Sequence, residues 1–192
     1  MKNMFARLLA CLLMAAMLIP CAAVAELDVS FDVPSFSDIF TPATGYSLDV
    51  PDVPSVQWTH ASGAISFQIP AEWTEAAPTD AGMLGRFIAA DQLGSMNVIV
   101  AQTYGENMVP AFDEIKQLYT EQYMQLGCTI DSFELSTYGG RDAIVCQYVY
   151  QGVQQTQVMI QPSDYTAMAT FTFAASAQKH INLVMNSVWM DE

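Results

Sequence analysis

Hydrophobic and polar residues alternate along three successive segments in the second half of the chain. These segments run from Asp142 to Gln151, from Gln154 to Gln161 and from Tyr165 to Phe173, with turn residues at Gly152-Val153 and Pro162-Ser163-Asp164 between them. A period of two residues bounded by turn-forming residues is typical of antiparallel strands. We therefore expect three neighbouring strands here, against which the other elements pack.

Four more strands are expected earlier in the chain. Val56 to Thr59 and Ala64 to Ile69 flank a short turn, and Met83 to Ala90 and Met96 to Thr103 flank another. The last of these contains a nearly unbroken apolar run over residues 97–101. Such a run indicates a strand that is buried on both faces.

Two segments have the three-and-four spacing of amphipathic helices. The first runs from Pro110, which suits a first helical turn, to Leu126, where Gly127 is a natural stop. The second runs from Ser176, a residue type that can cap a helix, to Trp189. We expect both apolar stripes to pack on the sheet; they comprise Phe112, Ile115, Tyr119, Tyr123 and Leu126 in the first helix and Ile181, Val184, Met185 and Val188 in the second.

Only two cysteines, Cys128 and Cys146, lie outside the N-terminal leader described below. If Gly139-Gly140 forms a two-residue hairpin turn, Phe133 lies opposite Cys146. Cys128 is then about 17 Å away along the strand, whereas bridged Cα atoms lie within about 7 Å. We expect two buried free thiols, with a disulfide only if this register is wrong.

The first 25 residues have the pattern of a secretion signal. Lys2 and Arg7 precede an apolar run from Leu8 to Ile19, which is too short to span a bilayer. The small residues Ala23-Val24-Ala25 then form a cleavage site, so the mature chain is expected to begin at Glu26. An uncleaved membrane anchor is the less favoured interpretation.

Cys21 allows a third interpretation, in which the chain is lipid-anchored. It follows Leu18-Ile19-Pro20 and so resembles a lipoprotein box, although Pro20 stands where such a box has a small residue. A single acyl chain would by itself anchor the protein only marginally. Cleavage after Ala25 and acylation at Cys21 therefore remain alternatives.

Residues 26–55 form an acidic segment that is rich in proline, and residues 56–192 form the expected domain. Proline at this density disfavours both helix and central strand. A semi-extended spacer is the first interpretation. The alternative is a docking segment, whose apolar anchors would be Phe31, Phe36, Ile39 and Phe40.

The charge of the chain excludes some classes of partner. The formal net charge is −14, and removal of the leader with Lys2 and Arg7 makes it −16. A chain this acidic is not suited to nucleic acid or to an anionic membrane surface. Solubility outside the cell is the favoured explanation, ahead of cation binding.

Groups that could perform catalysis are scarce. His60 lies in an expected turn and His180 beside the apolar stripe of a helix, so neither is favoured as a general base. The sequence contains no Gly-x-Ser-x-Gly motif, zinc-ligand spacing or calcium loop. No catalytic residue, metal ligand or cofactor site is therefore predicted. The residues Trp58, Trp73, Tyr138, Tyr148 and Tyr150 could line a groove, but burial in the core is favoured.

The order of elements resembles the PsbP-like and DcrB-like superfamily. The resemblance rests on Ile69-Pro70-Ala71-Glu72-Trp73 after a strand, on the Gly139-Gly140-Arg141 turn and on a closing helix near Ser187-Val188. It implies an α+β fold: an antiparallel sheet of about six to seven strands with helices on both faces, an α/β/α sandwich. It also implies a non-enzymatic surface or partner-binding module, and it transfers no catalytic residues.

We therefore expect a secreted or cell-surface, non-enzymatic binding module whose unknown protein partner lies at the cell envelope. The mature form is expected to have no transmembrane span and to bind no nucleic acid. The alternative is a small-ligand carrier with a pocket between sheet and helix, and a hydrolase is the least favoured class.

Overall fold

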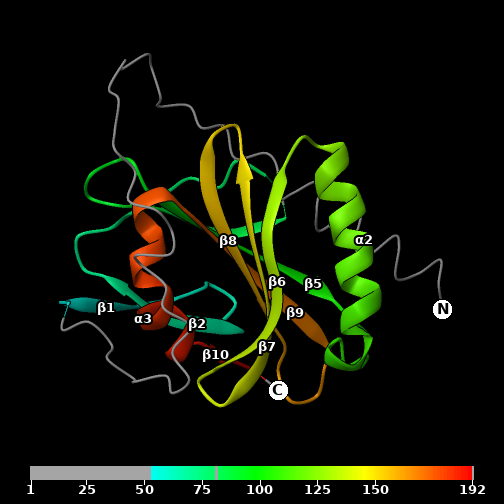
Figure 1. Cartoon of the computed structure of the whole chain (residues 1–192). Helices are drawn as coiled ribbons and strands as arrows, with labels where there is room; N and C mark the ends of the chain where they lie inside the picture. Colours follow the sequence, from blue (N-terminus) through cyan, green and yellow to red (C-terminus); the bar gives the residue numbers. More distant parts are fainter. Residues whose placement is uncertain (1–52, 81, 192) are drawn as a thin grey trace.

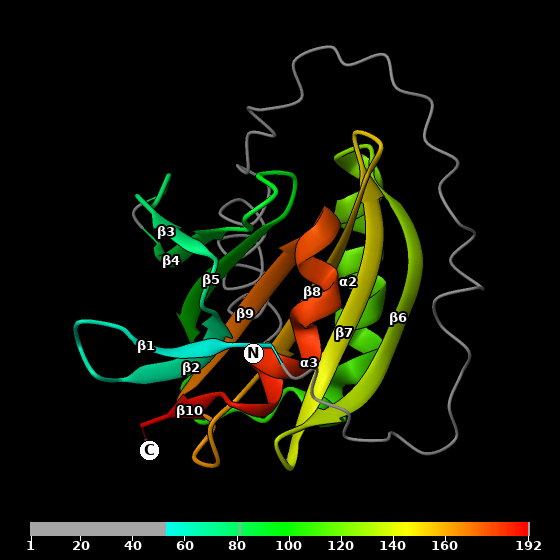
Figure 2. The same ribbon diagram turned by 90° about the vertical axis from the view of Figure 1, so that its left-hand side faces the viewer.

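A computed structural model describes residues 53–80 and 82–191. Seven strands form one antiparallel sheet in the order β3-β4-β5-β9-β8-β7-β6 (Figure 1 and Figure 2). Their bounds are Thr74–Ala76 (β3), Met83–Ile88 (β4), Ser95–Gln102 (β5), Thr129–Tyr138 (β6), Arg141–Tyr150 (β7), Val153–Ile160 (β8) and Ala167–Ala174 (β9). The α+β class and the seven-stranded antiparallel sheet agree with the sequence-based prediction.

A second, three-stranded sheet was not predicted. It has the order β1-β2-β10 and comprises Ser55–Thr59 (β1), Ile65–Pro70 (β2) and Trp189–Met190 (β10). β1 therefore begins at Ser55, which the expected boundary assigned to the linker. The Pro54 carbonyl also accepts a hydrogen bond from the Ala71 N–H at 2.8 Å, so the folded unit extends to at least that residue.

The first long helix was predicted almost correctly. A 3₁₀ turn, η2 (Val109–Ala111), leads into α2 (Phe112–Gln125). Ile115, Tyr119 and Tyr123 form its buried face, whereas Leu126 lies after the helix and is 46% exposed. Gly127 follows with φ of 78°, a conformation that glycine adopts without strain and that ends a helix.

The prediction of one helix from Ser176 to Trp189 was wrong. The segment forms a 3₁₀ helix, η3 (Ala175–His180), then the short α3 (Ile181–Asn186), and then β10. Ser176 does not cap the helix, because its hydroxyl donates to Asp91 Oδ1 at 2.9 Å. The end of the segment pairs with β2 instead of continuing as a helix, with Trp189 opposite Ser66 and Met190 opposite Ile65.

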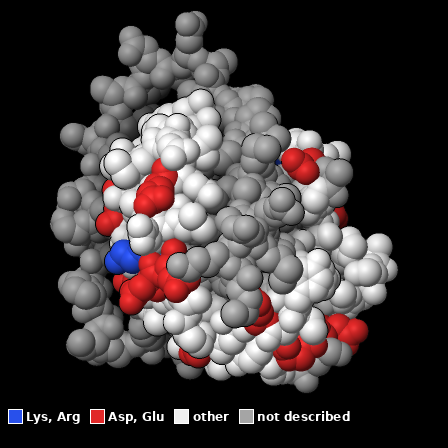
Figure 3. Space-filling view, turned by 90° about the vertical axis from the view of Figure 1, so that its right-hand side faces the viewer, with Lys and Arg blue, Asp and Glu red and all other residues white. Residues whose placement is uncertain are grey.

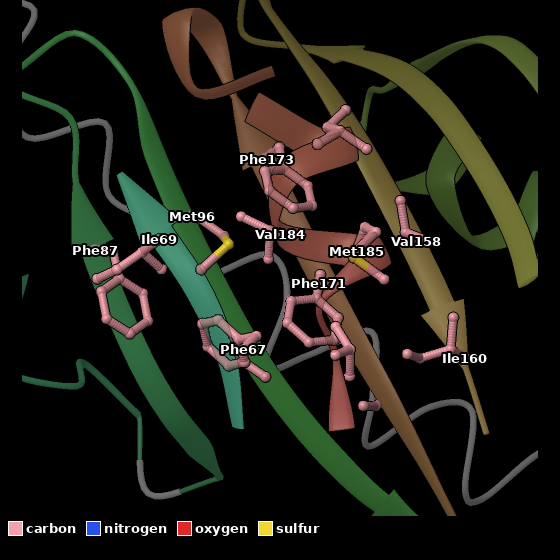
Figure 4. Close-up of a cluster of buried hydrophobic side chains, with 14 of the residues drawn as sticks. Phe67, Ile69, Phe87, Met96, Val158, Ile160, Phe171, Phe173, Val184 and Met185 are labelled. Atoms are coloured by element: carbon pink, nitrogen blue, oxygen red, sulfur yellow. The ribbon is translucent and has the colours of Figure 1, made fainter. Parts of the chain in front are cut away.

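Buried side chains form two hydrophobic clusters, and successive residues of β7 belong alternately to one cluster and to the other. Ala143 and Val145 belong to the first cluster, which also includes residues of the small sheet, η3 and α3. Figure 4 shows part of this cluster, with Phe67 of the small sheet and Val184 of α3. Ile144, Cys146 and Tyr148 belong to the second cluster, which includes the buried face of α2. Figure 2 shows α3 and the small sheet together in front of strands β8 and β9. Successive strand residues point to opposite faces, so the sheet separates the two clusters.

The hairpin between β6 and β7 has the predicted register. Gly139 and Gly140 form its two-residue turn with φ of 56° and 78°, and Phe133 lies opposite Cys146. A bulge then shifts the pairing between Ile130 and Ser132. Such positive φ values at both central residues are those of the type I′ turn, which matches the twist of the flanking strands.

Two turn positions differ from the prediction. The β7–β8 turn is formed by Gln151 and Gly152, one residue earlier than expected, with φ of 51° and 78°. The last strand of the meander begins at Ala167 instead of Tyr165, which remains in the preceding loop. This second difference changes the interpretation of Tyr165, because a loop residue need not face the core.

Candidate binding surface at one end of the sheet

The β5–β9 pairing continues beyond the ends of the two strands. After the Gln102–Ala167 pair, the Thr103 N–H donates to the Thr166 carbonyl at 2.8 Å and the Gly105 N–H donates to the Tyr165 carbonyl at 2.9 Å. This register brings Tyr104 and Tyr165 to the same end of the sheet, although they are far apart in sequence. We call residues 103–106 and 161–166 together the tyrosine tip.

Both tyrosines have a left-handed backbone conformation, with φ of 54° in each. For residues with a β-carbon this conformation costs on the order of 1–2 kcal/mol. Burial of the ring does not offset that cost, because Tyr104 is 69% exposed and Tyr165 is 36% exposed. Backbone strain of this kind tends to cluster at functional sites.

The side chain of Gln161 holds the two loops of the tyrosine tip together. Its Nε2 donates to Thr103 Oγ1 at 3.2 Å and to the Glu106 carbonyl at 2.9 Å. Its Oε1 accepts from the Met108 N–H at 2.8 Å. The Thr103 hydroxyl in turn donates to the Tyr165 carbonyl, so the backbone beside both tyrosines is fixed before any partner arrives.

The tyrosine tip carries carboxylates and no basic residue. Asp164 is exposed, and its Oδ1 accepts from the N–H and the hydroxyl of Thr166 at 3.0 and 2.8 Å. Glu106 is half-buried on the other loop. The sequence has no Lys or Arg in residues 87–115 or 142–178, the stretches that contain both loops.

Two basic residues near this end of the sheet are already engaged. Arg141, in the β6–β7 hairpin, donates from Nη1 to the Val188 carbonyl at 2.7 Å. The Lys116 ammonium of α2 lies 5.9 Å from the centre of the Phe112 ring. Seen from the side on which α2 lies in Figure 1, the surface has scattered acidic patches and little basic area (Figure 3).

The apolar anchors predicted in the linker, Phe31, Phe36, Ile39 and Phe40, lie outside the described residues, as do the predicted signal and Cys21. The docking-segment interpretation therefore stays a prediction. The structure instead brings together Tyr104 and Tyr165, which the sequence analysis did not single out. Tyr104-Gly105 and Asp164-Tyr165 do follow apolar strand patterns, and turn-forming residues at those places were the available signal.

The two histidines occupy different environments. His60 lies in the β1–β2 turn, where its Nδ1 is 2.7 Å from the Ser62 hydroxyl. His180 is 4% exposed and packs against Trp73, with ring centres 5.5 Å apart. Burial lowers the pKa of His180, and the nearby Lys179 lowers it further, although Glu72 and Asp91 act in the opposite direction.

Polar atoms of His180 and Trp73 are buried without hydrogen-bond partners. These atoms are both ring nitrogens of His180 and the indole Nε1 of Trp73. Neither ring nitrogen of His180 is hydrogen-bonded to a described group that could exchange a proton with it, so this histidine is not arranged as a general acid or base. The neutral form of His180 is favoured here, because a charged ring would be buried without a hydrogen-bonding partner.

Three tyrosines fill the space between α2 and the sheet; we call Tyr119, Tyr123 and Tyr148 the buried tyrosine layer. The Tyr123 and Tyr148 rings are 4.5 Å apart, and Tyr119 stacks on Tyr123 at 5.8 Å. The Tyr123 hydroxyl donates to Gln157 Oε1 at 2.8 Å and the Tyr148 hydroxyl to Gln155 Oε1 at 3.0 Å. Burial raises the pKa of all three phenols well above its ordinary value.

The aromatic residues considered for a groove are mainly packed in the interior. Trp73 and Tyr148 are buried. Trp58 is half-buried, with its ring 4.8 Å from that of Phe67 and 5.3 Å from that of Phe87. Tyr138 and Tyr150 are half-buried at the margins of the two clusters. These contacts favour the core interpretation of this set over a groove.

Cys128 and Cys146 are both free and buried, as predicted. Burial raises the pKa of Cys128, and it raises the pKa of Cys146 to about 12, with smaller contributions from Cys128 and Asp131. Because the thiolate is the reactive form of cysteine, neither thiol is poised for nucleophilic chemistry.

The described ranges, residues 53–80 and 82–191, present neither a metal site nor a membrane-spanning helix. No group of three or more His, Cys, Asp or Glu side chains in these ranges could hold a metal ion. None of the helices in the same ranges has both the length and the apolar character to span a bilayer.

Comparison with solved structures places the fold in a known class of α+β domains. The chain matches the cyanobacterial PsbP protein (CyanoP) of Synechocystis sp. PCC 6803 with a TM-score of 0.56 and 10% identity, over 77% of this chain and 99% of that one. A protein from Bacteroides thetaiotaomicron matches with a TM-score of 0.50 and 16% identity, over 73% of this chain and 50% of that one. LpqN of Mycobacterium tuberculosis, described as involved in cell envelope biogenesis, matches with a TM-score of 0.49 and 13% identity, over 78% of this chain and all of that one.

The match to CyanoP shows that the chain has the PsbP-like fold. No family model and no curated protein matches the chain by sequence. At identities this low the likeness concerns the fold alone, and a function has to be argued from the surface of this chain.

Proposed function

We propose that this chain is a secreted or cell-surface, non-enzymatic module that binds a protein partner at the cell envelope, with the tyrosine tip in the contact. In this proposal residues 1–25 are the signal, residues 26–52 a spacer and the remainder the binding domain. The domain is an α/β/α sandwich, with α2 on one face of the large sheet and α3 with the small sheet on the other.

One observation carries the proposal: two exposed tyrosines share one end of the sheet, each with φ of 54°. Tyrosine is enriched at interfaces, because its large ring is rigid and its hydroxyl tolerates water. A contact surface that is fixed before binding loses less conformational entropy when a partner docks. Glycine would adopt this backbone without strain, so both positions carry a side chain at some cost to stability.

A small-ligand carrier has less support from the structure. Its pocket would lie between α2 and the sheet, where the buried tyrosine layer is packed and its Tyr123 and Tyr148 hydroxyls are hydrogen-bonded. Hydrolytic activity has no supporting arrangement among the described residues, since His180 has no hydrogen-bond partner and both thiols have raised pKa values.

Cross-linked affinity capture from the native cell envelope tests the proposal. The baits are residues 26–192, residues 53–192, and residues 26–192 with Tyr104→Asn and Tyr165→Asn together. Asparagine tolerates a left-handed backbone better than most residues, so the double variant removes the rings with little added strain.

We expect a specific partner to be held by both unmodified baits and lost from the tyrosine variant. Met124→Gln is the matched control, because Met124 is 67% exposed just before the C-terminal end of α2, outside the tyrosine tip. Loss of the partner from the shorter bait alone would assign the contact to the segment of Phe31 to Phe40. A partner retained by the double tyrosine variant would rule out the tyrosine tip as the contact.

A further inference from the structure

We infer that the tyrosine tip recognises a cationic polypeptide segment, rich in Arg or Lys, on the partner. This inference rests on the proposed function and adds the chemical class of the partner. Exposed tyrosine rings and carboxylates occur together on the two loops of the tip. Tyrosine rings and carboxylates together attract guanidinium and ammonium groups, whereas the carboxylates repel anions.

The exposed faces of the two tyrosine rings can attract a cation. Tyr104 is 69% exposed and Tyr165 is 36% exposed, so part of each ring can contact a partner. A cation within about 6 Å of a tyrosine ring centre is attracted by the negative face of the ring. The chain itself contains such a contact, in which Lys116 Nζ lies 5.9 Å from the Phe112 ring centre.

Each of the two loops of the tyrosine tip also carries a carboxylate. Glu106 belongs to the loop of Tyr104, and Asp164 directly precedes Tyr165. Asp164 uses Oδ1 to accept from Thr166, and no bond from another described residue engages its Oδ2. A guanidinium group can therefore meet a carboxylate oxygen and an aromatic face on the same loop.

The charge of the whole chain decides between candidate partners. The linker contains Glu26, Asp28, Asp32, Asp38, Asp49 and Asp52 and no basic residue, so repulsion disfavours docking of the chain's own linker on the tip. A second copy of this acidic chain, a nucleic acid and an anionic lipid surface are disfavoured for the same reason. A basic segment of another protein is the partner whose charge complements the surface.

Fluorescence anisotropy with synthetic peptides tests the inference on residues 26–192. The probe is a labelled peptide of repeated Gly-Ser-Arg triplets, and the control peptides replace Arg with Gln or with Glu. We expect the Arg peptide alone to bind. Amide resonances of Tyr104, Gly105 and Tyr165 should shift in the NMR spectrum when it does.

Variants of the protein separate ring recognition from simple charge attraction. Removal of each ring, by Tyr104→Asn or Tyr165→Asn, should weaken binding about 2- to 5-fold. Glu106→Gln with Asp164→Asn should weaken binding most at low salt, because screening shortens the reach of charges at high salt. Glu121→Gln is the matched control, since it removes one exposed charge from the third turn of α2.

Three results would overturn the inference: no binding of the Arg peptide, equal binding of the Gln peptide, or equal binding of the Arg peptide to every variant. In the last case the attraction is only the general acidity of the protein. If the peptide fails but the native partner is still lost from the double tyrosine variant, the proposed function stands and only the cationic class is wrong. If the variant affects neither, both fail.

Discussion

Five tyrosines of this protein show how differently one residue type can be used in two regions. In the buried tyrosine layer, Tyr119, Tyr123 and Tyr148 are at most 1% exposed, and the hydroxyls of Tyr123 and Tyr148 meet glutamine oxygens. In the tyrosine tip, Tyr104 and Tyr165 are exposed on a strained backbone. The buried rings stabilise the fold, whereas the exposed rings add little packing to it and are available for contact with a partner. The comparison therefore separates residues that hold the domain together from residues that the domain presents.

Truncation of a ring in the buried tyrosine layer is expected to have the largest effect. Tyr148→Ala leaves a cavity beside Tyr123 and Cys146 and should lower the free energy of unfolding by about 3–5 kcal/mol. Chemical denaturation measures this loss of unfolding free energy, and Tyr165→Asn in the tyrosine tip is the control. A loss below about 1 kcal/mol would mean that the layer is not closely packed.

Removal of one hydroxyl from the buried layer should have an intermediate effect. Tyr123→Phe leaves the buried Gln157 Oε1 without its donor and should cost about 1–3 kcal/mol of unfolding free energy. The double variant Tyr123→Phe with Gln157→Leu removes both partners and should recover part of the loss. If Tyr123→Phe alone is neutral by denaturation, the hydrogen bond does not contribute to stability.

The buried His180 ring has no hydrogen-bond partner, unlike the Tyr123 and Tyr148 hydroxyls, and its burial should make the stability of the protein depend on pH. Because burial lowers the pKa of His180 in the folded state, the unfolded chain binds more protons as pH falls below about 6.5. Stability should then decrease toward acid pH, with a slope of at most about 1.4 kcal/mol per pH unit from this residue. His180→Phe should remove that part of the slope in denaturation curves recorded from pH 7 to pH 5. An unchanged slope would show that His180 is not buried in its neutral form.

Changes at the tyrosine tip should have the smallest effect on stability. Tyr104→Asn removes an exposed ring from a left-handed backbone, so the free energy of unfolding should change by less than about 0.5 kcal/mol or increase slightly. Thermal unfolding measures it beside Tyr148→Ala. A large destabilisation would show that Tyr104 is structural, and the contrast between the two regions would disappear.

Local sequence signals were sufficient to predict the central hairpin and α2. Gly139-Gly140 defines both the turn and the register, because a two-residue turn leaves no freedom in the pairing of Phe133 with Cys146. In α2, Gly127 ends the helix and the three-and-four spacing identifies Ile115, Tyr119 and Tyr123 as its buried face. In these cases the residues that decide the structure are neighbours in sequence.

The final segment could not be predicted because distant residues decide its structure. Ser176 binds Asp91 of the β4–β5 turn, and Gly94 of that turn packs so closely that a β-carbon there would lie 2.5 Å from the Ala177 nitrogen. Farther along, Ser187 Oγ accepts from the Gln68 N–H at 2.7 Å, and β10 then pairs with β2. These tertiary contacts, and not the helical spacing of the segment's apolar residues, decide the structure of residues 175–190.

The candidate surface was missed for a related reason. Tyr165 fits the alternating pattern of the strand that follows it, and only the three-dimensional register shows that it shares one end of the sheet with Tyr104. The apolar anchors predicted in the linker, from Phe31 to Phe40, stand out in the sequence because a pure spacer would not need apolar side chains. A surface built from two loops has no comparable signature in the sequence.

Site-specific photo-cross-linking in the native cell envelope tests whether the tyrosine tip contacts the partner. A benzophenone-bearing phenylalanine analogue replaces Tyr104 in one variant of the full chain and the equally exposed Met124 in another. If the tyrosine tip is the binding surface, position 104 gives a discrete cross-linked partner and position 124 gives none. A partner captured from position 124 but not from position 104 would contradict the assignment of the tyrosine tip as the binding surface.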